Sequence, residues 1–135
     1  MKFPYPMVRI ANAITNAALI TGIPRPPYTR NNALIVETRG RRSGKRRRLP
    51  VGFLDDGGRI IVVVEDGKRA QWVQNALAEN GRLRIFLRGA WRPARLEILD
   101  VAPEAYLEKM NRVHAMFVRH ESSTPGVIEL LPDKQ

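Results

Sequence analysis

The chain has no cysteine, only two histidines and few carboxylates for its length of 135 residues. The absence of cysteine excludes both a disulfide framework and a thiol nucleophile. His114 and His120 have no carboxylate at a metal-binding spacing. We therefore expect no metal site.

Long apolar runs are also missing, since no stretch approaches the roughly 20 apolar residues of a membrane-spanning helix. Asn12, Thr15 and Asn16 interrupt the N-terminal segment, so we expect no signal peptide and a cytoplasmic protein. Apolar residues within 7–20 recur at helical spacing and predict a short amphipathic helix. This helix packs on its own domain or lies on a membrane surface, and its single cation, Arg9, supports the membrane contact only weakly.

Positive charge, by contrast, is abundant and local. The net charge is +10, and seven of the 23 lysines and arginines lie between Arg39 and Arg48. The rest of the chain has 16 cations and 13 carboxylates, and this balance of charges is ordinary for a protein surface. The apolar flanks ALIVE and LPVGFL are unlike the neighbours of a disordered basic tail. We therefore expect one binding site for an anionic partner.

The rest of the pattern predicts hairpin-linked strands with helices between them. Strands are expected at 34–36, 49–54, 59–64, 82–87 and 91–99, and helices at 70–78 and from 103 to 117. Residues 55–58 read as a hairpin turn, and the continuous apolar run of 59–64 indicates burial on both faces. Helix 70–78 should end at Gly81 and bury one stripe of side chains, namely Trp72, Val73, Ala76 and Leu77.

This order predicts an α+β fold: a five- or six-stranded antiparallel sheet with flanking helices. Hairpin-linked sheets of this kind often close into a small barrel. We interpret residues 1–27 as an N-terminal helix with a proline-rich connection, and residues 28–135 as the barrel domain, so that the chain is one domain overall.

The basic stretch has the chemistry of an anion-binding loop. Residues 38–44 contain two glycines, which let backbone amides approach a ligand, and Ser43 adds a hydroxyl donor. The arginines add forked donors suited to phosphate or carboxylate. In the next strand Arg47 alternates with Leu49 and Val51 on the apolar face, where a charge usually has a partner. The alternative interpretation is a solvated basic hairpin.

Four segments follow one another in the sequence: GRRSGKRRRLP, DDGGRIIVVV, W-x-x-N and RLRIFLRG. Together these segments resemble the deazaflavin-dependent nitroreductase and quinone reductase family over about residues 33–100. The resemblance implies a flavin-reductase-like split β-barrel that binds coenzyme F-420, an 8-hydroxy-5-deazaflavin with a phosphate and an oligoglutamate tail; FMN is the alternative cofactor. It also implies hydride transfer from the reduced cofactor to a quinone, a nitro compound or another electron-poor acceptor.

The resemblance also assigns cofactor-binding positions. They are Arg41, Arg42, Ser43 and Gly44 in the loop, Arg47 and Pro50 in the next strand, and Glu65, Gly67, Lys68, Arg69, Trp72 and Asn75 after the central strand. Relatives usually carry a Ser-Lys-Gly-Gly-type stretch after that strand. Here residues 65–69 are shorter and begin with two acids, so Lys68 or Arg69 would replace the missing cation.

Tyr28, Tyr106 and His114 are candidates for a proton donor, each with a packing role as the alternative. No acid–base pair is required, because the cofactor supplies the hydride and the protein supplies orientation, electrostatics and exclusion of water. Two other functions stay open: a non-catalytic split barrel that holds the deazaflavin or an apolar ligand, and nucleic-acid binding. The chain lacks the interleaved aromatics of a single-strand platform, so we expect no nucleic-acid partner. A monomer and a homodimer are both compatible with the sequence.

Overall fold

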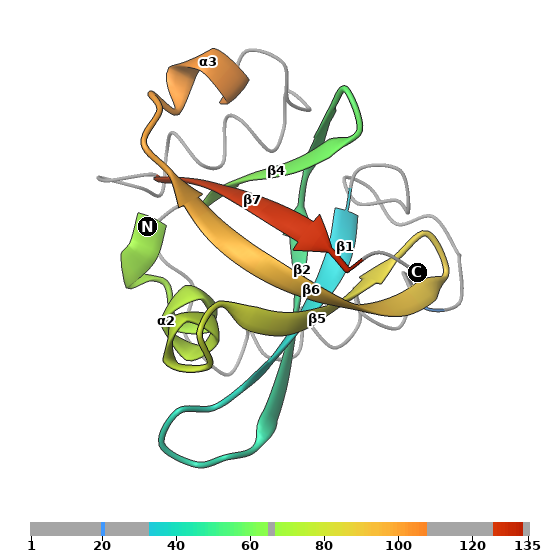
Figure 1. Ribbon diagram of the computed structural model, residues 1–135, viewed down its shortest axis with the longest axis vertical. Coiled ribbons are helices and arrows are strands. Elements are labelled where there is room, and N and C mark those ends of the chain that lie inside the picture. The colour runs from blue at the N-terminus through green and yellow to red at the C-terminus, as the bar shows by residue number, and fades with distance from the viewer. Residues whose placement is uncertain (1–19, 21–32, 65–66, 108–125, 134–135) are drawn as a thin grey trace, which may run out of the picture.

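The computed structural model describes residues 20, 33–64, 67–107 and 126–133. In this part of the chain seven strands form one antiparallel sheet in the order β2-β1-β5-β6-β7-β4-β3 (Figure 1). The strands are β1 (Ala33–Arg39), β2 (Arg46–Gly52), β3 (Leu54–Asp56), β4 (Arg59–Val64), β5 (Arg82–Leu87), β6 (Ala90–Leu99) and β7 (Gly126–Pro132). The helices are the short turn η1 (Gly67–Arg69), α2 (Gln71–Ala78) and α3 (Glu104–Leu107).

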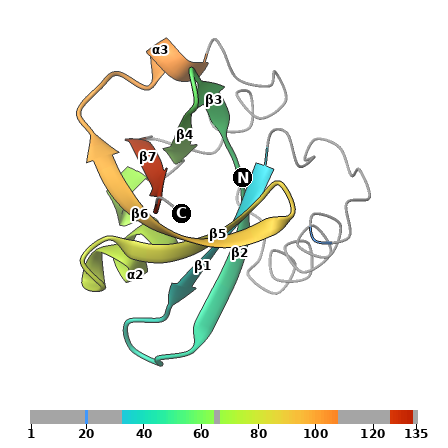
Figure 2. The same cartoon turned by 45° about the vertical axis from the view of Figure 1, so that its right-hand side comes forward.

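The sheet curls into a half-barrel whose two edges are joined by the chain itself. The edge strands β2 and β3 are separated only by Phe53, which is buried. Figure 2 shows β2 running directly into β3 across the open side of the curled sheet. One bent segment therefore bridges the two edges of the curled sheet, and no ladder pairs the edge strands β2 and β3 with each other.

Apolar side chains fill the inside of the curl. In β1 the inward positions are Leu34 and Val36, and α2 covers them with Trp72, Val73 and Ala76. The same cluster includes Val51, Phe53, Ile60, Val62, Val64, Leu83, Ile85, Leu87, Ala94, Leu96, Ile128 and Leu130. This contiguous core fixes α2 beside the end of the sheet that carries the β1–β2 hairpin (Figure 1).

Two smaller apolar clusters lie on the outer face. One joins Ile61, Val63 and Val127, against which Tyr106 of α3 packs. The other joins Ala33, Ile35 and Phe86, against which Trp91 packs. Residues of β4 are consequently buried on both faces, as the apolar run of 59–64 predicted.

The α+β half-barrel was predicted correctly, but its number of strands was not. The sheet has seven strands rather than five or six, because β3 separates from β2 at Phe53 and because β7 inserts between β4 and β6. Helix α2 ends as predicted, with Gly81 at a φ of +82°. Its buried stripe differs at one position, since Leu77 is 40% exposed and Asn75 is buried instead.

Several expectations fall outside the described residues. They are the N-terminal helix within 7–20, the boundary near residue 27, and the C-terminal helix beyond Leu107. Within the part that the structure describes, no helix is long and apolar enough to cross a membrane.

Candidate functional site

The β1–β2 hairpin carries a compact loop, Gly40–Lys45, whose backbone is held by its own hydrogen bonds. The amide of Gly40 donates to the carbonyl of Lys45 at 2.8 Å, and the amide of Gly44 donates to the carbonyl of Gly40 at 2.8 Å. The amide of Lys45 donates to Ser43 Oγ at 3.2 Å. Gly44 has a φ of +70°, a conformation that other L-residues adopt at a cost. These hydrogen bonds define the shape of the loop.

Several hydrogen-bond donors of this loop have no partner in the described part of the chain. The consecutive amides of Arg42 and Ser43 make no hydrogen bond there. Ser43 Oγ only accepts a bond, so its hydroxyl proton is available. A Cβ at Gly40 would lie 2.7 Å from Ser43 Oγ and 3.8 Å from Arg47 Nε, so glycine permits the close approach of both groups. Successive free amides of this kind form a cradle for an oxyanion.

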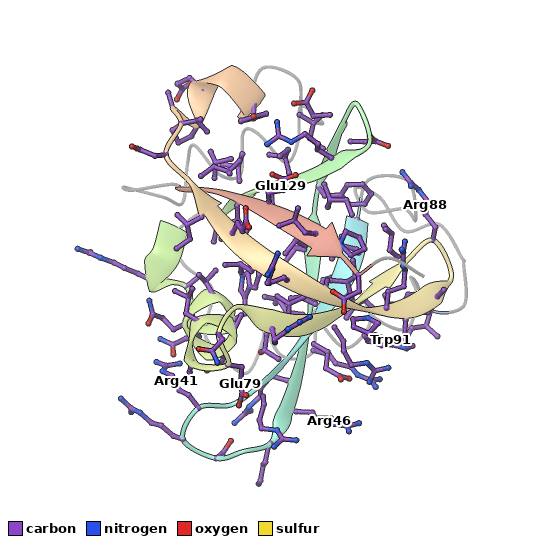
Figure 3. All side chains as sticks on the ribbon, viewed as in Figure 1. Arg41, Arg46, Glu79, Arg88, Trp91 and Glu129 are labelled. Carbon is purple, nitrogen blue, oxygen red and sulfur yellow. The ribbon has the colours of Figure 1, made fainter. Side chains whose placement is uncertain are left out.

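Arg41 fastens the loop to helix α2. Its amide and its Nη1 both donate to Asn75 Oδ1, at 3.3 and 2.8 Å, and its Nη2 donates to Gln71 Oε1 at 2.9 Å. Gln71 and Asn75 are one helical turn apart, so both amides face the loop. Asn75 is only 7% exposed, so burial holds in place the side-chain oxygen that accepts the hydrogen bonds from Arg41. Arg41 and Asn75, both predicted cofactor residues, therefore form a clamp between loop and helix. Figure 3 shows Arg41 beside α2.

Three cations of the loop and of the inner face of β2 remain unpaired among the described residues: Arg42, Lys45 and Arg47. All three are exposed and make no ion pair or side-chain hydrogen bond within the described residues. Arg47 lies on the face of β2 that also carries Leu49 and Val51, opposite Thr38 of β1. The hydroxyl of Thr38 is buried and has no hydrogen-bond partner among the residues that the structure describes. Within the described part of the chain, no carboxylate pairs with Arg47, the cation that alternation placed on the apolar face.

Arg48, on the opposite face of β2, is not a free surface charge. Its Nε donates to Glu37 Oε2 at 2.8 Å, and Arg84 Nη1 donates to Glu37 Oε1 at 3.0 Å. Both guanidinium groups also stack over Trp91, at 4.6 and 4.9 Å from the ring centre. Burial raises the pKa of Glu37, but the bond from Arg48 and the charges of Arg84, Arg48 and Arg46 outweigh it, so its pKa lies below the usual 4.5.

The other predicted cofactor residues are distributed around this end of the barrel. Pro50 is buried on the face of β2 opposite to Arg47, across from Ile35. Gly67 opens η1, next to α2, and Arg69 is exposed. Trp72 is buried in the core, where its ring packs among apolar side chains. Glu65 and the side chain of Lys68 lie outside the described residues.

The three proton-donor candidates are not brought together near the loop. Tyr106 packs on the outer cluster of β4 and β7, and α3 lies at the end of the molecule opposite to the hairpin (Figure 1). Tyr28 and His114 fall outside the described residues.

Two contributing residues were not foreseen, Gln71 and Glu37. The spacing of two amide side chains at i and i+4 on a predicted helix is a signal that could have identified Gln71. Glu37 is the only acid in the segment of 31 to 54, and the hairpin register places it opposite Arg48. Its second partner, Arg84, is 47 residues away and could not have been found from local spacing.

Residues 15–129 match the F420H2-dependent quinone reductase family. The chain belongs to this family. No curated protein sequence matches it. As a member of that family it is an oxidoreductase, and the cofactor of the family is coenzyme F-420.

Solved structures of similar fold agree with a split barrel. An F420-H2-dependent reductase, FDR-A, has a TM-score of 0.52 at 18% identity, over 74% of this chain and 93% of that one. The heme storage protein HutZ from Vibrio cholerae has a TM-score of 0.57 at 13% identity, over 78% and 86% of the two chains. A domain-swapped dimer has a TM-score of 0.53 at 18% identity, over 96% and 99%. At these identities the likeness establishes the fold, which is the flavin-reductase-like split barrel.

Proposed function

We propose that the Gly40–Lys45 loop and Arg47 bind the phosphate of coenzyme F-420, and that the protein reduces a quinone or a similar electron-poor acceptor. The observation that carries this proposal is the set of unused donors on one ordered loop. Two consecutive amides, one hydroxyl and the side chains of Arg42, Lys45 and Arg47, which are unpaired among the described residues, occupy a segment of eight residues, 40–47.

The donor set fits the phosphate and the acidic tail of F-420 better than it fits a neutral ligand. A phosphate accepts several hydrogen bonds at once and favours charge-assisted donors such as Arg42 and Arg47. The absence of a Cβ at Gly40 keeps the loop open where Ser43 and Arg47 approach each other. The carboxylates of an oligoglutamate tail would explain why more cations are present than one phosphate needs.

In this proposal the residues of the chain bind and orient, and the bound reduced F-420 supplies a hydride. The Arg41–Asn75 clamp keeps the loop in place, so that little ordering is required when the anion binds. Arg42, Lys45 and Arg47 neutralise the phosphate. Gly67 and Arg69 lie at the start of the helical segment that the clamp joins to the loop, and they are the described residues of the 65–69 stretch that would contact the cofactor.

Membership of the family does not by itself identify the molecule that accepts the hydride. The family's name points to quinones, and we infer the same class for this chain, with nitro compounds as a second class of acceptor. Both are electron-poor and planar, and neither needs a dedicated acid–base pair in the protein before hydride transfer.

Turnover of reduced F-420 in the presence of a quinone tests the proposal. The full chain is mixed with reduced F-420 and a short-chain quinone, and the return of the absorbance of oxidised F-420 is followed; the same mixture with reduced FMN is the control. We expect quinone-dependent oxidation with F-420 and little protein-dependent oxidation with FMN. Binding of F-420 without any acceptor-dependent oxidation would overturn the reductase and favour a non-catalytic binding protein.

A further inference from the structure

A buried hydroxyl beside the loop makes no hydrogen bond within the described part of the chain. Thr38 of β1 is only 4% exposed, and its Oγ1 has no partner among the described residues. Buried polar groups in proteins are nearly always hydrogen-bonded, and one that is not lowers the stability of the folded state. An unsatisfied hydroxyl next to a binding loop is a candidate for a hydrogen bond that forms only when the ligand is present.

Packing in the core does not explain why this position carries a hydroxyl. Side chains alternate along a strand, so Thr38 lies on the same inner face of β1 as Leu34 and Val36, which both belong to the core. Valine has the same β-branched shape as threonine and would bury no polar atom at this position. The fold alone would therefore be served better by valine than by Thr38.

Arg47 is the cross-strand neighbour of Thr38. The two residues are directly opposite each other on β1 and β2. Residues paired in this way have Cβ atoms about 4.5–5.5 Å apart on one face of the sheet. Arg47 Nε also lies 3.8 Å from the position that a Cβ would take at Gly40. The side chain of Arg47 therefore runs from a point beside Thr38 toward the loop.

The guanidinium of Arg47 has enough donors for two partners. It carries five N–H groups in a fixed fork, and none of them bonds to a described residue. Ordering an exposed arginine at a binding site costs side-chain entropy. A hydrogen bond to an acceptor that the core holds in place reduces the number of orientations open to the fork, so a larger share of its binding energy reaches the ligand.

Thr38 is placed to act on the anion through Arg47 rather than directly. Its Oγ1 is buried, so an anion in the loop does not touch it while the core keeps its shape. Arg47 is both exposed to solvent and opposite Thr38. One arm of its guanidinium can therefore contact the hydroxyl while the other contacts an anion.

We propose that Thr38 is a positioning residue for the anion site. When an anion is bound, Thr38 Oγ1 accepts a hydrogen bond from the guanidinium of Arg47 and fixes the fork toward the anion. The identity of the anion rests on the proposed function, which places the phosphate of F-420 at the loop. Thr38 touches neither the phosphate nor the reacting atoms, and in the free protein its unsatisfied hydroxyl lowers stability.

The replacement Thr38→Val should change stability and binding in opposite directions. It removes an unsatisfied buried hydroxyl and keeps the shape of the side chain, so the ligand-free protein should melt roughly 3–6 °C higher. It also removes the acceptor of a charge-assisted bond from Arg47, so the affinity for F-420 should fall about tenfold. Thr38→Ser keeps the hydroxyl and should stay within about threefold of the wild type. A purely structural role would instead lower stability and affinity together.

The test combines thermal melting without ligand and titration with oxidised F-420. The proteins are the wild type, Thr38→Val, Thr38→Ser, Arg47→Ala and the double variant Thr38→Val/Arg47→Ala. Because Thr38 acts through Arg47, Thr38→Val should cost less than about twofold in affinity once Arg47 is alanine. Inorganic pyrophosphate is titrated into the same proteins as a second probe, since it offers an anion without a deazaflavin. We expect the same order of affinities with both ligands.

Three results would overturn the proposal. A lower melting temperature of Thr38→Val would mean that the hydroxyl already has a partner in the free protein. Unchanged affinity of Thr38→Val for both ligands would mean that Arg47 needs no anchor. A loss of about tenfold that persists in the Arg47→Ala background would separate Thr38 from Arg47.

Failure of the proposed function gives a different pattern. The wild type would then bind pyrophosphate but not F-420, and Thr38→Val would still weaken the binding of pyrophosphate. That result would keep the role of Thr38 and remove the cofactor assignment. Absence of binding of either ligand to the wild type would overturn both.

Discussion

The clamp between Arg41 and helix α2 offers a test of how the loop is held in shape. Replacing Asn75 by alanine removes the oxygen that accepts from the amide and Nη1 of Arg41, at 3.3 and 2.8 Å. A hydrogen bond from a charged group contributes about 1.5–3 kcal/mol, and a hydrogen bond between neutral groups contributes about 0.5–1.5 kcal/mol net. Because the Arg41 side chain is exposed and water can replace its bond, we take the lower end of both ranges. The total is about 2 kcal/mol, or roughly 30-fold in the equilibrium between the closed and the open loop.

Amide hydrogen exchange measures this equilibrium directly. The amides of Gly40 and Gly44 are protected by bonds within the loop, so their exchange in Asn75→Ala should accelerate about 10- to 30-fold. Gln71→Ala removes only an exposed acceptor and should change the same rates less than about threefold. Asn75→Asp keeps an acceptor and should preserve the protection. Unchanged exchange at Gly40 and Gly44 in Asn75→Ala would refute the clamp.

The other predictions concern the Glu37 cluster and the loop glycine. Glu37→Gln should lower the melting temperature by about 7 °C, because about 2 kcal/mol of charge-assisted hydrogen bonding is lost. Calorimetry would measure this shift in melting temperature. The pKa of Glu37 is lowered in the folded protein, so the stability that this carboxylate contributes is complete above pH 4.5 and disappears as the pH falls through the pKa of the folded state. The difference in stability between the wild type and Glu37→Gln should therefore shrink in the same pH window. A stability difference that stays constant with pH would contradict this. Gly40→Ala should weaken F-420 binding at least tenfold by pushing Ser43 aside, while thermal melting shows little change; adding Ser43→Ala should relieve the clash.

The local elements of this fold could be predicted from the sequence, because each has a strong pattern of its own. The apolar run of β4 indicated a strand buried on both faces, and Gly81 marked the end of α2. Alternation along β2 placed Arg47 on one face and Arg48 on the other, as the register confirms. The basic segment was likewise recognised as a loop between two strands.

What could not be predicted depends on contacts between distant segments. Strand β7 has a mostly apolar sequence, Val127–Leu131, interrupted by Glu129, but its place between β4 and β6 follows only from the complete sheet. For the same reason the local sequence around Arg48 does not reveal that this arginine has partners. The long-range neighbours Arg84 and Trp91 bring it into a cluster around Glu37. Arg95, exposed and unpaired among the described residues, is a suitable control for the loop.

The central claim is that the loop and Arg47 form a phosphate site for F-420. The most direct measurement is a titration of F-420 and of FMN, at one salt concentration, into the wild type and the variants Arg42→Ala, Arg47→Ala and Arg95→Ala. A charge-assisted bond to a bound anion contributes about 1.5–3 kcal/mol, so the two loop variants should lose at least tenfold in affinity for F-420. Arg95→Ala should lose less than about threefold, and FMN should bind more weakly than F-420 throughout. Equal losses in the three variants, or FMN binding as tight as that of F-420, would contradict the claim.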